Sequence, residues 1–313
     1  MARGSARVRE EGVRFVSEGR RLRLAAPAKI NLVLDLLGSR EDGYTEIATV
    51  YQTVELADEV TVSVAEGPDR TVIEAEGLDL PPERNLAWRA AEVYRRAAGW
   101  SGGIRIALRK RIPEGAGLGG GSSDAAAVLV ALEELAGRRL GKEALRRLAS
   151  RLGADVPFLL EGGLAIGRGR GDELEPLPDW PRPLPVVLAR LGPPLSTAEV
   201  YARARLTPRR DPPKIQRFLD QLRAAPRRLP PVGNMLFGPA AELRPAIRRL
   251  VQRLAEAGGR AAMTGSGSAV FGLFAAEEEA AAAARALAAA EPEAWVCLTR
   301  TLPRGGRARA GGA

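Results

Sequence analysis

The 313-residue sequence contains no histidine and only one cysteine, Cys297. An internal disulfide is therefore excluded, and a zinc site made of histidine and cysteine ligands cannot be assembled. The lack of disulfides is typical of a reducing compartment, so we expect a cytoplasmic protein. Because histidine is the most common general base in enzymes, a proton acceptor in this chain must be another side chain, and a carboxylate suits the role best.

Long hydrophobic runs are also missing from the sequence. No stretch approaches the roughly 18 to 20 apolar residues that a membrane-spanning helix needs. The first 22 residues are rich in arginine and glutamate and contain no apolar segment of the kind found in secretory signals. We therefore expect no membrane partner.

Aromatic residues amount to only 4% of the chain, although its formal net charge is +9. A strongly basic chain favours nucleic-acid binding, because lysine and arginine neutralise phosphates. Here the basic residues are spread over every segment, and no aromatic signature of an RNA-binding domain is present. A nucleic-acid binder is therefore kept only as an alternative, and we expect no nucleic-acid partner.

Lysine is scarce, since arginine supplies 43 of the 47 basic residues and lysine occurs only at Lys29, Lys110, Lys142 and Lys214. Lysine provides a compact charge whose pKa can shift, which a guanidinium cannot do. Lys29 lies in the apolar segment APAKINLVL, where a charge favours a function, although a lysine that reaches out to solvent is the alternative. Lys110 and Lys142 lie in charged stretches, and we attribute them to chance.

The length of the chain fits two domains, because typical domains have roughly 100 to 200 residues. We predict a flexible extension over 1–21, a first domain over 22–180, a second domain over 181–303 and a flexible tail over 304–313. The proline-dense stretch 177–185, LPDWPRPLP, is the candidate boundary.

Hydrophobic periodicity predicts a mixture of strands and helices. The predicted strands are 21–38, 48–64, 70–77, 103–112, 185–192, 269–274 and 294–300. The predicted helices are 85–99, 124–137, 142–153, 197–205, 240–258 and 277–290. Residues 154–177 are predicted to form a turn with short strands, and the segment rich in arginine and proline after 205 is left without an assignment. This order of elements indicates an α+β fold.

A glycine-rich segment, PEGAGLGGGSS from Pro113 to Ser123, connects a predicted strand to a predicted helix. Residues without bulky side chains let backbone amides approach a ligand, and the start of a helix directs its unpaired N–H groups and positive dipole end at an anion. The segment therefore predicts a phosphate site. Ser122 and Ser123 could donate hydrogen bonds to phosphate, or one of them could orient a metal.

Two other phosphate-binding motifs compete for this segment. A Walker A loop requires a lysine before its serine or threonine, whereas Gly121 is followed directly by Ser122. Gly115, Gly117 and Gly120 match the dinucleotide fingerprint, so a dinucleotide-binding oxidoreductase remains an alternative. Against it, the acids nearest the required spacing, Glu133 and Glu134, fall inside the following helix.

The segment PEGAGLGGGSSDAAA resembles the phosphate-binding motif of the GHMP superfamily, which is named for galactokinase, homoserine kinase, mevalonate kinase and phosphomevalonate kinase. Within that superfamily, four further segments resemble the family of 4-diphosphocytidyl-2-C-methyl-D-erythritol kinases. They are PAKINLVLDLLGSREDGY with TVYQTVELADEV, then GADVPFLL, LSTAEVY and MTGSGSAVFGLF. These motifs run in the family's order over residues 22–303, nearly the whole chain.

The resemblance implies a two-domain α+β architecture. Its N-terminal ATP-binding kinase domain, residues 22–180, would be a ribosomal-protein-like α/β domain, and its C-terminal GHMP kinase domain, residues 181–303, would be ferredoxin-like. It implies that ATP, with Mg²⁺, phosphorylates the 2-hydroxyl of a small cytidine diphosphate-linked substrate in the non-mevalonate route to isopentenyl diphosphate. We expect a monomer or homodimer. Another GHMP small-molecule kinase is the alternative enzyme.

The resemblance also assigns roles to individual residues. It implies that Asp155, in GADVP, is the catalytic base and that Lys29, in PAKIN, is its partner. Ser123 is the candidate metal ligand. The expected ATP-binding residues are Pro113, Glu114, Gly115, Ala116, Gly117, Leu118, Gly119, Gly120, Gly121, Ser122 and Ser123.

Substrate binding is expected from Asn31, Tyr44 and Thr45. Tyr44 resembles the family tyrosine that stacks on the cytosine ring, and stacking is a general source of affinity for a base. The family usually has histidine after this tyrosine, so Thr45 predicts a weaker or rearranged contact with cytosine. Asn31 is expected to bind the substrate or to orient Lys29, and the alternative is that it satisfies a carbonyl at a strand edge. A second glycine loop, Thr264 to Ser268, is expected to close near the phosphate or the substrate.

Overall fold

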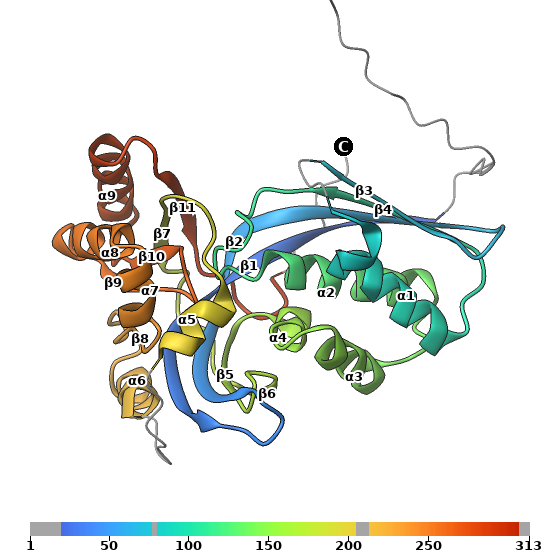
Figure 1. Ribbon diagram of the computed structural model, residues 1–313, viewed down its shortest axis with the longest axis horizontal. Coiled ribbons are helices and arrows are strands. Elements are labelled where there is room, and N and C mark those ends of the chain that lie inside the picture. The colour runs from blue at the N-terminus through green and yellow to red at the C-terminus, as the bar shows by residue number, and fades with distance from the viewer. Residues whose placement is uncertain (1–19, 77–79, 205–212, 307–313) are drawn as a thin grey trace, which may run out of the picture.

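The computed structural model describes residues 20–76, 80–204 and 213–306. It has two lobes, and Figure 1 shows that the long strands β1 (Arg21–Ser39) and β2 (Thr45–Ala65) extend from one lobe to the other. Each lobe has its own sheet with helices packed on it. The predicted two-domain α+β architecture is therefore confirmed.

The N-terminal sheet has seven strands, of which five follow the order β3-β4-β2-β1-β8, while β5 pairs with β2 and β6 pairs with β5. Most neighbours are antiparallel, and the parallel pairs are β1 with β8 and β3 with β4. The remaining strands of this sheet are β3 (Thr71–Glu76), β4 (Gly103–Arg109), β5 (Leu164–Arg168), β6 (Glu173–Pro176) and β8 (Gly233–Asn234). The doubly wound parallel sheet that a dinucleotide-binding fingerprint requires is not found in the described ranges.

Helices cover one face of this sheet, as Figure 1 shows. They are α1 (Leu86–Ala98), α2 (Gly120–Leu135), α3 (Lys142–Leu152) and α4 (Val156–Glu161), with a short 3₁₀ turn η1 (Pro82–Arg84) before α1. The predicted helix over 85–99 is confirmed, since Asn85 caps its start and Gly99 ends it in the left-handed region.

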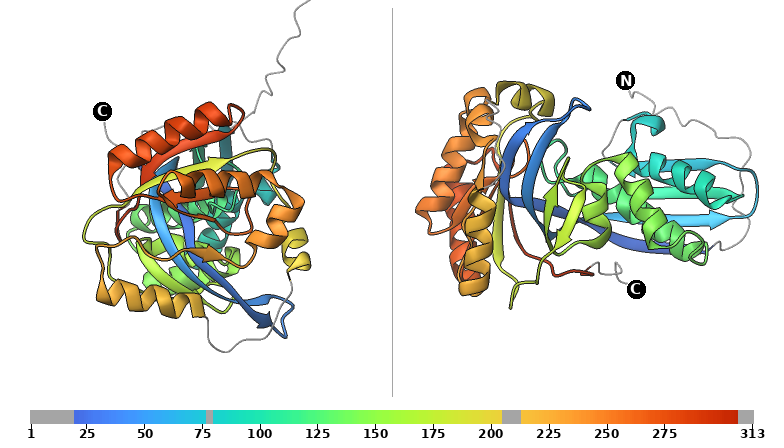
Figure 2. Two further views of the ribbon diagram at one scale, coloured as in Figure 1. Left: turned by 90° about the vertical axis from the view of Figure 1, so that its left-hand side faces the viewer. Right: turned by 90° about the horizontal axis from the view of Figure 1, so that it is seen from below.

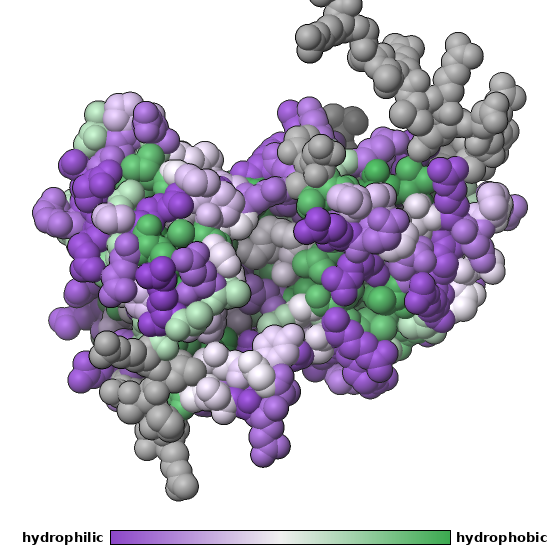
Figure 3. Space-filling view, viewed as in Figure 1, coloured by the Kyte–Doolittle hydropathy of each residue, from purple (hydrophilic) through white to green (hydrophobic). Residues whose placement is uncertain are grey.

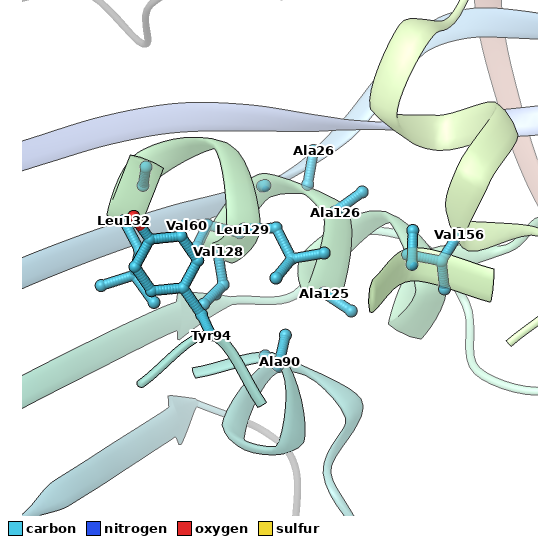
Figure 4. Close-up of a cluster of buried hydrophobic side chains, with 14 of the residues drawn as sticks. Ala26, Val60, Ala90, Tyr94, Ala125, Ala126, Val128, Leu129, Leu132 and Val156 are labelled. Carbon is cyan, nitrogen blue, oxygen red and sulfur yellow. The ribbon is translucent and has the colours of Figure 1, made fainter. Parts of the chain in front are cut away.

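The central helix α2 is buried on nearly all sides, as a helix with an apolar surface all round requires. Leu129, Leu132 and Val128 pack with Val60 of β2 and Tyr94 of α1 in the core shown in Figure 4. The Tyr94 hydroxyl donates a 2.7 Å hydrogen bond to Glu133 of α2. The buried carboxylate on this helix therefore has a hydrogen-bond partner. The core therefore fixes α2, and with it the end of the glycine-rich segment.

The C-terminal lobe contains an antiparallel sheet of order β11-β7-β10-β9, the strand order of a ferredoxin-like domain. Its strands are β7 (Pro185–Arg190), β9 (Arg260–Met263), β10 (Val270–Leu273) and β11 (Trp295–Arg300). The helices of this lobe are α5 (Thr197–Arg203), α6 (Pro213–Ala224), α7 (Phe237–Leu243), α8 (Ala246–Glu256) and α9 (Glu277–Ala290). Both α8 and α9 cover the outer face of the sheet, as Figures 1 and 2 show.

The inner face of the C-terminal sheet shares a core with the hairpin of β1 and β2. Ile30 and Val50 belong to the same buried cluster as Leu188 and Phe271. After β7 the chain returns to the N-terminal sheet at two points. There β8 pairs with β1, and the Leu302 N–H donates to the Thr53 carbonyl. The two lobes are therefore held together by backbone pairing as well as by apolar contact.

Several local predictions differ from the structure. Pro245 divides the predicted helix 240–258 into α7 and α8, because proline cannot continue the hydrogen-bonding pattern of a helix. The helix α2 begins at Gly120, four residues before the predicted start at 124. Residues 156–161 form the helix α4, with Pro157 in its first turn, where we expected a turn and short strands.

The predicted terminal extensions lie mostly outside the described residues, which begin at 20 and end at 306. Within the predicted tail, the Arg304 N–H donates to the Asp179 carboxylate and the Gly305 N–H to the Glu161 carbonyl.

Hydrophilic residues predominate on the face of both lobes shown in Figure 3. None of the helices in the described part of the chain is long and apolar enough to cross a membrane.

Candidate active site

Irregularities in the β1–β2 pairing lie at the two polar residues that were predicted for the site. The register shifts between Pro27 and Lys29 and again between Asn31 and Val33. Shifts of this kind bend a strand and change the direction of its side chains, and they are common next to active sites. Lys29 is only 3% exposed, and its backbone N–H donates a 2.9 Å hydrogen bond to the Leu118 carbonyl of the glycine-rich segment.

The two residues expected to carry catalysis face each other. The Lys29 ammonium nitrogen lies 3.3 Å from an Asp155 carboxylate oxygen and donates to the Asn31 side-chain oxygen at 2.8 Å. The Tyr51 hydroxyl donates to the other Asp155 oxygen at 3.1 Å. The Asp155 side chain is 28% exposed while that of Lys29 is almost fully buried, so the carboxylate is oriented by buried groups but remains accessible.

Two tyrosine hydroxyls near Asp155 stay protonated at neutral pH. Burial raises the pKa of Tyr51 well above its ordinary value, and the nearby Asp155 charge adds to the rise. Burial, followed by Asp155, raises the pKa of Tyr201 to about 12. Neither tyrosine is therefore suited to act as the base, whereas a carboxylate such as that of Asp155 is chemically suited to accept a proton.

The two glycine loops touch each other without room for side chains. A β-carbon on Gly117 would lie 2.3 Å from the Thr264 carbonyl oxygen, and one on Gly265 would lie 3.1 Å from Gly117. The Thr264 hydroxyl donates to the Gly117 carbonyl at 3.2 Å, and the Ala269 N–H donates to the Ala116 carbonyl at 3.0 Å. Glycine at both positions is thus required by this contact between the lobes.

Asn31 connects the second glycine loop to the catalytic pair. Its side-chain oxygen accepts from Lys29 and from the Gly265 N–H at 3.0 Å, and its amide nitrogen donates to Thr49 at 2.8 Å. These contacts match the expected role of Asn31 in orienting Lys29, and Asn31 also lines the cleft cavity where a substrate contact is expected.

Two adjoining cavities border the glycine-rich segment. The first, named here the loop cavity, has a volume of about 350 Å³ and is lined by the residues Leu80, Arg84, Asn85, Leu86, Lys110, Ile112, Pro113 to Ser122 and Asp124. The second, named here the cleft cavity, has a volume of about 720 Å³ and lies between the lobes. Gly115, Gly117, Gly119 and Ser122 line both cavities, so a ligand in one can reach the other.

The predicted phosphate-binding segment thus borders the loop cavity with one exception. Ser123, the candidate metal ligand, is fully buried, and its hydroxyl donates to the Pro27 carbonyl at 2.7 Å. Because α2 begins at Gly120, Ser123 faces β1 and its neighbour Ser122 faces the cavities. The expectation that Ser123 is exposed to a ligand is therefore wrong, and Ser122 is the available hydroxyl. No cluster of three or more acidic or cysteine side chains suited to a metal is present in the described ranges.

Tyr44 and Thr45, two of the expected substrate residues, line the cleft cavity together with two residues that sequence analysis missed. Tyr44, 57% exposed, and Thr45 line it at the start of β2. Arg170 lines it from the β5–β6 turn, with its guanidinium 5.3 Å from the Tyr44 ring centre, and Tyr201 lines it from α5. The only sequence signals for these two were the glycines around Arg170 and the tyrosine in LSTAEVY.

The fold and this site define a GHMP kinase. The GHMP kinases N terminal domain matches residues 85–163, and the GHMP kinases C terminal domain matches residues 211–293. A crystal structure of homoserine kinase from Cytophaga hutchinsonii has the same fold, with a TM-score of 0.71 at 18% identity over 95% of this chain and 99% of that one.

Much closer similarity comes from one branch of the superfamily. The 4-diphosphocytidyl-2-C-methyl-D-erythritol kinase of Geobacter metallireducens is 42% identical over 268 residues, which cover 85% of this chain and 94% of the relative. That of Pelotomaculum thermopropionicum is 45% identical over 82% of this chain and 90% of its own. A crystal structure of 4-(cytidine 5'-diphospho)-2C-methyl-D-erythritol kinase is 41% identical, with a TM-score of 0.75 over 90% of this chain and all of that one. The chain belongs to the 4-diphosphocytidyl-2-C-methyl-D-erythritol kinase family.

Proposed function

We propose that this enzyme transfers the γ-phosphoryl group of ATP to the 2-hydroxyl of 4-diphosphocytidyl-2-C-methyl-D-erythritol. The observation that carries the proposal is the contact between Lys29 and Asp155 in the cleft cavity, beside the glycine-rich segment. Phosphoryl transfer requires a nucleophile and a phosphate in line, stabilisation of negative charge and an acceptor for the hydroxyl proton. Asp155 offers the proton acceptor, Lys29 offers a positive charge, and the adjoining glycine-rich segment offers a phosphate site.

In the proposed step, Asp155 accepts the proton of the substrate 2-hydroxyl. At the same time the oxygen of that hydroxyl forms the new bond to the γ-phosphorus. The bond between that phosphorus and the bridging oxygen breaks, and ADP leaves. Lys29 contacts the Asp155 carboxylate and places positive charge where the phosphoryl group passes. Tyr51 holds one carboxylate oxygen, which leaves the second for the substrate.

The loop cavity is the proposed ATP site. The segment from Pro113 to Ser122 lines it with small residues, and α2 directs its N-terminal amides towards it. Mg²⁺ is proposed to enter with ATP and to neutralise phosphate charge. The available oxygen donors, Ser122 and Asp155, fit an ion that keeps several waters and takes one or two protein ligands beside the phosphates.

The cytidine end of the substrate is proposed to lie against Tyr44 and Tyr201. Tyrosine rings that border a cavity offer stacking surfaces for a base, worth roughly 1 to 3 kcal/mol per base. Arg170 adds a cation on the Tyr44 ring and is fixed by a 2.6 Å ion pair with Asp172. Thr45 offers one hydroxyl where the family usually has histidine.

ATP consumption measured with and without the diphosphocytidyl substrate tests the proposal, and phosphorus NMR of the product identifies the hydroxyl that is phosphorylated. Mevalonate and homoserine serve as alternative acceptors. Among these three alcohols, we expect turnover only with the cytidyl substrate. Faster turnover with another alcohol would contradict the substrate assignment, while ATP consumption independent of any alcohol would contradict kinase function.

We further propose a cytoplasmic enzyme, monomeric or homodimeric, that needs no nucleic-acid or membrane partner. The single cysteine supports this location, because a chain without disulfides is suited to a reducing compartment. Analytical ultracentrifugation distinguishes the two oligomeric states.

A further inference from the structure

Lys110, which we attributed to chance, lies in a buried ion network beside the loop cavity. Its ammonium group makes ion pairs with the carboxylates of Asp58 in β2 and Asp124 in α2. Asp58 is 1% exposed and Asp124 2% exposed. Burying charges has a large cost unless they are paired, so two buried carboxylates that share one lysine require an explanation.

The network ties together the two ends of the glycine-rich segment. Asp58 accepts hydrogen bonds from the Arg111 and Ile112 N–H groups, the latter at 2.8 Å, just before the segment begins at Pro113. Asp124 lies in the second turn of α2, just after the segment ends. Lys110 connects these two acids, so the strand end and the helix start are fixed to one another and to β2.

The network also faces the ligand side. Lys110 and Asp124 line the loop cavity, and neither lines the cleft cavity. One oxygen of Asp124 is buried without a hydrogen-bond partner in the described part of the chain. Burial raises the pKa of Asp124 to about 7, although Lys110 opposes the rise.

We propose that Asp58, Lys110 and Asp124 are positioning residues that hold the glycine-rich segment in the shape that binds the nucleotide. The proposal rests on the proposed function only in that the nucleotide is ATP. A segment with this many glycines loses much conformational freedom when it binds a ligand. Fixing both of its ends in advance lowers that cost and strengthens binding.

The test is calorimetric titration of the folded variants Asp58→Asn and Lys110→Met with ATP and Mg²⁺, together with steady-state kinetics. Asp58→Asn keeps an oxygen that can accept from the Ile112 N–H but loses the charge that holds Lys110. We expect the Kd for ATP to rise by about tenfold or more in both variants, the effect typical of lost preorganisation. We expect the KM for the cytidyl substrate to change by less than about twofold, and Lys110→Arg to recover part of the ATP affinity.

Asp35→Asn provides a matched control. Asp35 is also buried, pairs with a lysine through the 2.9 Å contact to Lys214, and has one oxygen without a partner in the described ranges. It lines neither cavity, so its loss is expected to lower stability without changing the Kd for ATP.

An ATP Kd within about twofold of the parent in the folded Asp58→Asn variant would overturn the proposal. An equal weakening of ATP binding in Asp35→Asn would also overturn it, because the effect would then be general destabilisation. If the parent binds ATP but does not phosphorylate the cytidyl substrate, the proposed function fails, while the Kd values still decide the role of the network.

Discussion

Two lysines border the glycine-rich segment, and their partners differ in exposure. Lys29 lines the cleft cavity and faces Asp155, whose side chain is 28% exposed. Lys110 lines the loop cavity and faces Asp58 and Asp124, which are nearly inaccessible. A carboxylate must be accessible to receive a proton from a substrate. Buried carboxylates are suited instead to fixing the position of neighbouring segments. In our proposals the same pair of residue types serves two roles, and accessibility separates them.

The electrostatics of the second region support this distinction. Burial lowers the pKa of Lys110, but Asp124 and Asp58 raise it by more, so the lysine stays charged within the network. The Lys110 ammonium pairs with two carboxylates, whereas that of Lys29 pairs with one carboxylate and one amide oxygen. Lysine is suited here because one compact ammonium group can pair with both buried carboxylates.

The largest expected effect breaks the accessible pair. Asp155→Asn removes the proton acceptor while keeping the shape of the side chain, so the single-turnover rate should fall by about 10²- to 10⁴-fold. ATP binding should persist, because Asp155 does not line the loop cavity and asparagine keeps an oxygen that can face the metal. Rapid-quench measurement of ADP formation checks this. Asp220→Asn, an exposed carboxylate on α6, is the control and should keep the parent rate. A near-parent rate in Asp155→Asn would disprove its role as base.

The next effect concerns the contact of the two glycine loops between these regions. Gly117→Ala places a β-carbon against the Thr264 carbonyl at a residue with φ of 78°, so unfolding free energy should fall by about 2 to 4 kcal/mol. Gly137→Ala isolates the backbone cost, since φ is 75° there and nothing lies within 4 Å. Urea denaturation measures both. Equal losses in the two variants would show that the contact between the loops is not tight.

A smaller effect distinguishes the buried network by its pH dependence. The raised pKa of Asp124 means that the folded state binds a proton more tightly than the unfolded state. Stability from this group is therefore present at pH 4 and is lost as the pH rises towards 7. Asp124→Asn should remove this decline, which is on the order of 2 to 3 kcal/mol between pH 5 and pH 8. Urea denaturation of both proteins at pH 5 and pH 8 tests it, and an unchanged pH dependence in the variant would contradict it.

The smallest effect concerns the cytosine end of the cleft cavity. Thr45→His restores the residue usual in the family, and one added hydrogen bond of about 0.5 to 1.5 kcal/mol should lower the KM for the cytidyl substrate several-fold. Thr45→Val, which removes the hydroxyl but keeps the shape, should raise it. Steady-state kinetics at saturating ATP measure both. A KM that does not fall in Thr45→His would refute this interpretation of Thr45.

Periodic elements were predictable from the sequence, while their interruptions were less so. The helix over 277–290 and the helix over 85–99 have clear apolar patterns, and both are present within a residue of the prediction. The division at Pro245 was readable in principle, but the apolar pattern on both sides hid it. The two-residue strand β8 has no sequence signal, because only its pairing with β1 defines it.

The site residues show a similar division. Lys29, Asp155 and the glycine-rich segment were predicted from scarcity, motif and resemblance, and the structure brings them together around the cleft. The position of Ser123 was predicted wrongly because α2 begins four residues earlier than expected. Ser123 therefore lies within the helix and faces Pro27 of β1. Arg170 and Tyr201 reach the cavity from distant segments, and the glycines around Arg170 and the segment LSTAEVY did not show that their side chains would line it.

The sequence by itself determined the family, the identity of the helices and strands with strong periodicity, and the absence of histidine and disulfide chemistry. Only the tertiary structure decided which lysines matter, because burial and the position of carboxylates far along the chain set their roles. Asp58, Lys110 and Asp124 are separated by 52 and 14 residues in sequence, yet they meet at one point of the fold. Electrostatic interactions depend on distance and on exposure to water, and neither can be read from the order of residues.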